Sequence, residues 1–169
     1  VGIPIGSEEN LTGMIDVVNQ KALIHDPSDE FGSKIDVEEL EGDLKETAEM
    51  AYQELLEAVG DRDEEVMGML LEDKTPDATQ LKQAIRRLTV AGEIVPVLGG
   101  SAFKNKGVQP MVDAVIDYLP SPLDVDVQAG ADPDDETEIT EFPADDNAPF
   151  CSLAFKLWTD PFAGKLVFF

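Results

Sequence analysis

The residues best placed to do chemistry lie in a glycine-rich turn in the second half of the chain. An apolar run at residues 94–98 is followed directly by Gly99-Gly100-Ser101-Ala102-Phe103. In open α/β folds, ligands bind at the carboxyl ends of the strands, and small residues let backbone N–H groups approach a flat ligand closely. The pattern therefore predicts that backbone N–H groups of this turn border a ligand crevice, although the three residues Ser101, Ala102 and Phe103 are by themselves a weak signal.

A second group consists of carboxylates near the end of a predicted helix. Glu54, Glu57 and Asp61 are spaced three and four residues apart, so they share one face if the helix extends that far. Such a face can dock a basic partner. The alternative is a solvated helix face that only keeps the chain soluble.

The other candidate groups do not indicate catalysis. His25 is the single histidine and has no evident nucleophile nearby, so a catalytic triad is unsupported and we expect a surface or hairpin histidine. Lys82, Arg86 and Arg87 form a basic cluster, where we expect internal ion pairs rather than nucleic-acid binding, because many carboxylates compete for these cations. We predict no catalytic residue and no metal ligands in this chain.

Several elements must position these residues. Two β-favouring stretches, residues 13–18 and 21–25, predict a hairpin. Apolar residues recur every three or four positions from Asp36 to Val59, which predicts an amphipathic helix. Further helices are expected after Asp63, after Thr75 and from residue 108 until Pro120, and residues 94–98 are expected to form a buried strand of an α/β sheet. These ranges are 36–59, 63–71, 75–88, 94–98 and 108–119.

Composition restricts the function further. The 169 residues include 36 acidic and 12 basic side chains, which gives a formal net charge of −24. This charge disfavours binding to the phosphate backbone of nucleic acids. One cysteine, Cys151, allows no internal disulfide and suits a reducing compartment. No apolar run is long enough for a membrane span and no signal peptide is recognised, so we expect a cytoplasmic monomer without a membrane partner.

The last third of the chain differs from the rest. Residues 124–146 contain ten acidic residues and no basic one, which predicts a solvated linker. Beyond it, residues 150–158 and 166–169 are typical of strands on either side of a turn at residues 159–164. The chain starts without Met and stops inside an apolar run, so we expect a piece of a longer protein.

The stretch from Ile94 through Gly99-Gly100-Ser101-Ala102-Phe103-Lys104-Asn105-Lys106-Gly107 to Pro122 closely resembles bacterial translation elongation factor G. Ile3-Pro4-Ile5-Gly6 and Asp160-Pro161-Phe162-Ala163-Gly164 extend the resemblance to both ends of the chain. The resemblance implies an α/β fold, part of a P-loop GTPase-type domain with a helical insert, followed by the first strands of a β-barrel domain. The implied boundaries are 1–122 for the GTPase part, about 26–92 for the insert, 123–147 for the acidic linker and 148–169 for the barrel strands.

The resemblance also implies roles for the candidate residues. Ser101, Ala102 and Phe103 correspond to the motif whose backbone lies beside the guanine base. Glu54, Glu57 and Asp61 correspond to the acidic helix that meets the stalk protein of the large ribosomal subunit. The chain has no Gly-x-x-x-x-Gly-Lys-Ser/Thr loop and no Asn-Lys-x-Asp motif, so GTP and Mg²⁺ are cofactors of the intact GTPase and none is expected for this chain alone.

The function implied is part of a ribosomal translocase, which drives GTP-dependent movement of tRNA and mRNA during protein synthesis. Two alternatives stay open. One is a related translational GTPase, such as a release, recycling or ribosome-protection factor. The other is a stand-alone acidic interaction protein without a nucleotide role.

Overall fold

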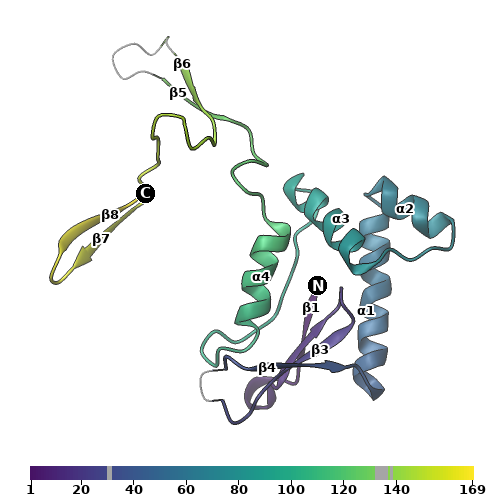
Figure 1. Ribbon diagram of the computed structural model, residues 1–169. Coiled ribbons are helices and arrows are strands. Elements are labelled where there is room, and N and C mark those ends of the chain that lie inside the picture. The colour runs from purple at the N-terminus through teal and green to yellow at the C-terminus, as the bar shows by residue number, and fades with distance from the viewer. Residues whose placement is uncertain (30–31, 132–136, 138) are drawn as a thin grey trace. The chain divides into compact units, whose positions relative to one another are not determined.

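The chain folds into two compact units in the computed structural model, which describes residues 1–29, 32–131, 137 and 139–169. The units are Val1–Pro120 and Ser121–Phe169 (Figure 1). The first unit combines a four-stranded antiparallel sheet with helices, and the described part of the second contains two hairpins. The predicted fold class, α/β followed by β strands, is confirmed at this level.

The sheet of the first unit is a meander in the order β1-β2-β3-β4. The predicted hairpin is confirmed as β2 and β3, with Asp16 opposite Lys21. Asp16 also accepts a hydrogen bond from the backbone N–H of Asn19 at 2.9 Å, which stabilises the connecting turn. The strands are β1 Gly2–Ile5, β2 Gly13–Asp16, β3 Lys21–His25 and β4 Ile35–Glu39, and a short 3₁₀ turn, η1, covers Glu8–Asn10.

The fourth strand corrects one prediction. The long helix was expected to begin at Asp36, but β4 occupies this region and helix α1 begins at Gly42. Val37 fits a helical repeat by spacing, yet it lies opposite Leu23 in the sheet. Backbone pairing with β3 outweighs the local helical pattern here, because the overlap of residues 36–39 at a helix end carries little periodic information.

In the described part of the chain, four helices form where the apolar repeats predict them. Two begin with aspartate caps, since Asp63 accepts from Val66 N–H at 3.1 Å and Asp77 accepts from Gln80 N–H at 2.9 Å. The Gln80 side chain accepts the Asp77 N–H in return, which completes a capping box. The helices are α1 Gly42–Gly60, α2 Glu64–Leu71, α3 Ala78–Val90 and α4 Val108–Tyr118.

The main hydrophobic core lies between the helices. Leu81 and Ile85 of α3 and Val59 of α1 are fully buried. A second cluster joins the sheet to α1 through Ile15, Val17 and Ala48. The other buried members of the main cluster are Val18, Leu56, Val66, Ala84, Leu88 and Tyr118. These two clusters hold α1 in place, and α1 carries the predicted acidic face.

Residues 94–98 do not form the predicted buried strand. The segment is extended, and its exposure alternates, with Val95 82% and Val97 70% exposed while Ile94, Pro96 and Leu98 are half-buried. Its backbone meets β1, where Gly2 N–H donates to the Val97 carbonyl at 3.3 Å, and Ile94 packs against the main core cluster. A continuous apolar run predicts burial on both faces, but the described residues provide packing for one face only.

The second unit is described by itself. The predicted linker contains a hairpin that the sequence did not indicate, β5 Gln128–Ala131 with β6 Ile139–Phe142; residues 132–136 and 138 of that prediction lie outside the described part. The terminal strands are confirmed as β7 Lys156–Asp160 and β8 Gly164–Phe168, although residues 150–155 are not part of a strand. The Phe150 and Phe169 rings pack edge to face, with 5.9 Å between the ring centroids.

Candidate functional site

The three predicted ligand-side residues lie together in one closed turn. Ser101 and Lys106 exchange two backbone hydrogen bonds, of 2.8 and 3.0 Å, and Asn105 N–H donates to the Ala102 carbonyl at 3.2 Å. The tip is open to solvent, because Ala102 is exposed and Phe103 is 99% exposed. The sequence therefore predicted correctly that these residues form a turn between the segment at 94–98 and helix α4.

The base of the turn is held by side chains and backbone groups far away in the sequence. Lys104 Nζ donates to the Glu8 carbonyl at 3.0 Å, and Lys106 Nζ donates to the Leu11 carbonyl at 2.6 Å. These contacts join the turn to the loop between β1 and β2. The sequence reasoning missed both lysines as anchors, because nothing in their local pattern identifies a backbone acceptor some 95 residues away.

His25 supplies a further anchor from strand β3. Its Nε2 accepts the Gly107 N–H at 3.0 Å, and the side chain is buried, with 4% of the residue exposed. The prediction of a surface or hairpin histidine is therefore right for the hairpin but wrong for the surface. Burial lowers the pKa of His25, and the nearby Lys106 charge lowers this pKa further, whereas the Gly32 backbone and Asp29 raise it.

The end of the turn requires glycine. Gly107 has φ +79°, and a Cβ there would lie 2.9 Å from the Gly99 carbonyl oxygen and 2.7 Å from the Met14 methyl group. Because of its left-handed conformation and this close packing, any side chain at position 107 would destabilise the turn. The turn is thus a close-packed structure with an exposed tip, which suits backbone contact with a flat ligand.

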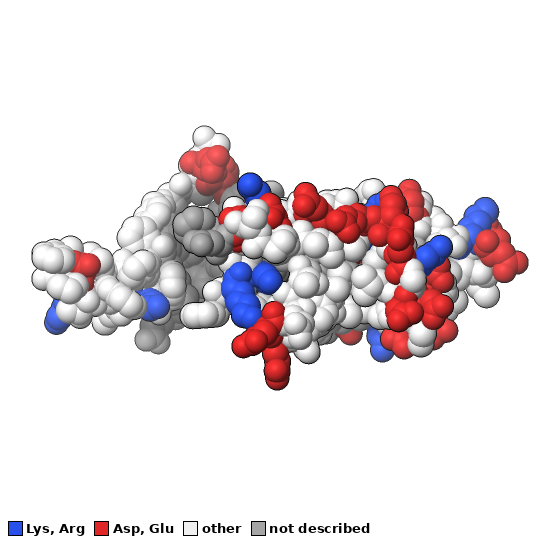
Figure 2. Space-filling model, turned by 90° about the horizontal axis from the view of Figure 1, so that it is seen from below, with Lys and Arg blue, Asp and Glu red and all other residues white. Residues whose placement is uncertain are grey.

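The predicted acidic group lies on α1, on the side of the helix opposite its buried stripe. Glu54, Glu57 and Asp61 are all exposed, and Asp61 directly follows the last helical residue. None of the three forms an ion pair with a described residue. Carboxylate groups also cover far more of the face seen in Figure 2 than cationic groups do. The structure therefore leaves these charges free to meet a partner.

The basic cluster is engaged internally, as predicted. Lys82 pairs with Asp117 at 2.7 Å, and Arg87 pairs with Asp63 at 2.8 Å. Arg86 donates to three carbonyls at the end of α4, the shortest bond being 2.8 Å to Leu119. These cations join α3 to α2 and α4, so they are structural.

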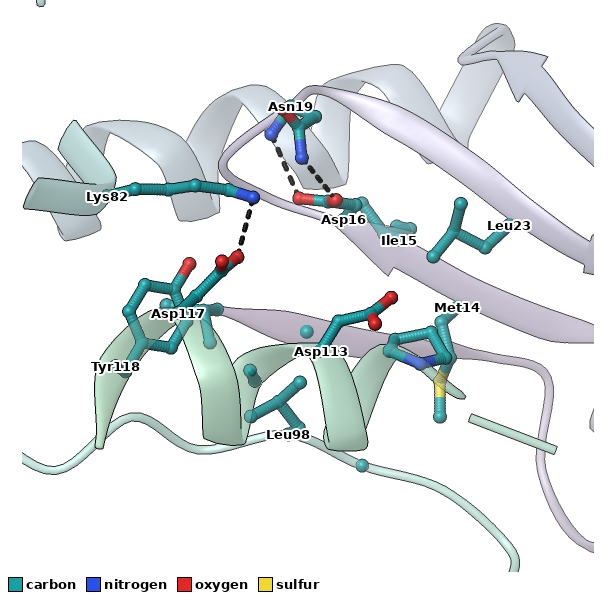
Figure 3. A pocket seen from close by; sticks show the side chains of 15 residues that line it. Met14, Ile15, Asp16, Asn19, Leu23, Lys82, Leu98, Asp113, Asp117 and Tyr118 are labelled. Atoms are coloured by element: carbon teal, nitrogen blue, oxygen red, sulfur yellow. Dashed lines mark hydrogen bonds and ion pairs between the residues drawn. The ribbon is translucent and has the colours of Figure 1, made fainter. Parts of the chain in front are cut away.

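A pocket of about 220 Å³ lies between the sheet, α3 and α4 (Figure 3). Lys82 and Asp117 face each other at one end, and Asn19 binds Asp16 with its side-chain amide at 2.6 Å. Ligand pockets usually measure about 300–1,000 Å³, so this one is small, and two pairs of its polar side chains, Lys82 with Asp117 and Asn19 with Asp16, bind each other. In the described residues, no cluster of three or more His, Cys, Asp or Glu side chains could hold a metal.

Comparison with known proteins agrees with this architecture. No protein-family model matches the chain. The fold is similar to the crystal structure of a protein from Thermus thermophilus, with a TM-score of 0.67 and 22% sequence identity over 99% of this chain. The chain spans 22% of the length of that protein. Among the described residues, none of the helices is long and apolar enough to cross a membrane. The comparison shows that this succession of elements also occurs within a longer chain.

Proposed function

We propose that this chain is part of a ribosomal translocase of the elongation factor G type, in which it supplies a guanine-side turn and a stalk-docking helix. The observation that carries the proposal is the turn at Ser101, Ala102 and Phe103, whose tip is exposed while its base is anchored to β3 and to the β1–β2 loop. A preorganised backbone binds a flat base with little further ordering cost. The resemblance of residues 94–122 to the family supports the guanine base as the ligand.

The exposed apolar residues around the turn support a larger domain. Val95, Val97 and Ile116 are 70–82% exposed, and Figure 1 shows the extended segment running beside α4. In an α/β sheet these side chains would be covered by neighbouring strands and helices. We infer that they pack against other parts of a longer GTPase domain.

Phosphate binding, Mg²⁺ binding and catalysis belong to those other parts. One backbone hydrogen bond contributes only about 1 kcal/mol net, while micromolar affinity needs about 8 kcal/mol. We therefore expect the 169-residue chain to bind GTP too weakly to detect. GTP hydrolysis and movement of tRNA and mRNA are proposed for the intact protein.

The acidic face of α1 serves recruitment in this proposal. Glu54, Glu57 and Asp61 are unpaired in the described structure, so they can attract a basic stalk domain without first breaking internal ion pairs. Opposite charges accelerate encounter, and the effect weakens when salt shortens the Debye length from about 10 Å at 0.1 M to about 3 Å at 1 M.

The test is an NMR titration of the chain with the C-terminal domain of the ribosomal stalk protein, at about 0.1 M and about 1 M salt. Salt-sensitive shifts around Glu54 to Asp61 are expected, with no response to GTP alone. The variant with Glu54→Lys and Glu57→Lys should associate more slowly. The control variant Glu93→Lys changes an exposed carboxylate beyond α3 and should associate like wild type after correction for its smaller change in net charge. Equal rates for both variants would remove α1 from the interface.

A further inference from the structure

His25 is the one anchor of the turn, among the described contacts, that can change its hydrogen-bonding character near neutral pH. Its Nε2 accepts the Gly107 N–H, so in the observed arrangement the ring is neutral and carries its proton on Nδ1. The acceptors in the two lysine contacts are the backbone carbonyls of Glu8 and Leu11, which do not titrate. An imidazole is the side chain whose charge changes most readily between pH 5 and 8.

We propose that His25 is a positioning residue for the turn at Ser101, Ala102 and Phe103, and that protonation of its ring releases the Gly107 end of that turn. A protonated ring carries N–H groups on both nitrogens. Nε2–H would then face the Gly107 N–H, and two donors in contact repel each other. The turn would lose its link to strand β3 and keep the lysine links to the β1–β2 loop.

Burial makes this change consequential. The His25 side chain is almost fully enclosed, and its Nδ1 is a buried atom with no hydrogen-bond partner of standard geometry among the described residues. Gly107 is also buried and packed against Met14 and Gly99. Water therefore has little space to replace the lost bond, and the ring or the turn must move when the ring becomes charged.

The groups that surround the ring come from four parts of the first unit. The Gly32 backbone and Asp29, both in the loop after β3, favour a positive charge on the ring, whereas Lys106 of the turn disfavours one. In the sheet, the paired positions next to His25 are Ile35 of β4 and Thr12 before β2, which are uncharged. With burial as the largest influence, the neutral ring is the form that the native structure favours.

The consequence for ligand binding rests on the proposed function, because it assumes that the turn contacts the guanine base. If it does, acidification would loosen the exposed backbone that the base requires. The structural link between His25 and the turn does not depend on that assumption. It can be measured in this chain without nucleotide or ribosome, so failure of this inference and failure of the proposed function are distinguishable.

The experiment follows the Gly107 and Ser101 amide signals of the 169-residue chain by NMR from about pH 8 to about pH 5. Wild type should show one inflection below about pH 6.5 at both amides. His25→Gln places an amide oxygen near the position of Nε2, accepts the same N–H and does not titrate, so the inflection should vanish. An inflection that persists in His25→Gln, or none in wild type, would overturn the inference.

Two further readouts separate positioning from general stability. Ring ¹⁵N shifts at about pH 8 should show Nδ1 protonated and Nε2 bare; the opposite tautomer would overturn the inference. His25→Asn is too short to reach Gly107, so the Gly107 amide should exchange with solvent roughly tenfold faster than in His25→Gln, because one hydrogen bond is lost. Equal exchange rates would show that the bond does not hold the turn. Amides of Leu81 and Ile85 serve as internal controls for the unaffected core.

Discussion

Replacing Asp63 by alanine should destabilise the helical part of the first unit by about 2 kcal/mol. The Asp63 carboxylate has two functions in the structure. It caps α2 by accepting the Val66 N–H at 3.1 Å, and it binds Arg87 of α3 through Nε at 3.0 Å and a terminal nitrogen at 2.8 Å. Its side chain is only 6% exposed, so water cannot take over both roles.

The two contributions can be separated. Loss of an aspartate cap costs about 1 kcal/mol. The ion pair is worth about 1 kcal/mol rather than the larger value of a buried pair, because the Arg87 side chain is 46% exposed and retains Glu65 at 2.7 Å. Asp63→Asn should keep the cap and lose the charge, which costs about 1 kcal/mol. The difference between Asp63→Ala and Asp63→Asn then measures the contribution of the cap.

Urea unfolding followed by far-ultraviolet circular dichroism measures these differences. With a slope of about 2 kcal/mol per molar urea, Asp63→Ala should lower the midpoint by about 1 M and Asp63→Asn by about half as much. Glu64→Ala is the matched control, since Glu64 is the exposed neighbour in the same turn and should change stability by less than about 0.5 kcal/mol. A loss below about 0.5 kcal/mol for Asp63→Ala, or identical midpoints for both Asp63 variants, would refute the reasoning.

Three further predictions concern single positions. Gly107→Ala should cost about 2 kcal/mol or more, because φ is +79° and the new Cβ would lie 2.9 Å from a backbone oxygen; an unchanged urea midpoint would contradict this. Asp61→Asn should stabilise by about 0.3–1 kcal/mol by removing a negative charge at the α1 C-terminus, and thermal unfolding without a gain would argue against it. The pKa of His25 is lowered in the folded state, so as the pH drops the unfolded chain binds the extra proton first. The free energy of unfolding of wild type, relative to that of His25→Gln, should therefore fall below about pH 6.5. A difference that does not change with pH would count against the buried neutral ring.

The local pattern was sufficient for most of the secondary structure. The helices formed by residues 42–60, 64–71, 78–90 and 108–118 follow apolar repeats and side-chain or proline signals that lie within each segment. The hairpin of β2 and β3 follows from two β-favouring stretches joined by a short turn. The internal role of Lys82 and Arg87 followed from the excess of carboxylates in the composition.

Two predictions failed for a common reason. Residues 36–39 have helical spacing but pair with β3, and residues 94–98 are apolar enough for a buried strand but pack on one side only. In both cases the outcome depends on which neighbour is present, and a short run of residues holds no information about that neighbour.

The candidate site shows the same division. The residue types alone indicated that Ser101, Ala102 and Phe103 form a turn, because glycines before it and a helix after it are local features. They also indicated that Glu54 and Glu57 share an exposed helix face.

Only the tertiary structure decided what holds the turn. His25 meets Gly107 across 82 residues, and Lys106 meets the Leu11 carbonyl across 95. These bonds arise when the sheet and the turn pack together, and the backbone acceptors have no signature in the amino-acid sequence. The sequence by itself determined the local elements and the charge of the molecule, because periodicity, caps and composition act over a few residues. The fold determined the buried state of His25, because burial is a property of the assembled neighbours.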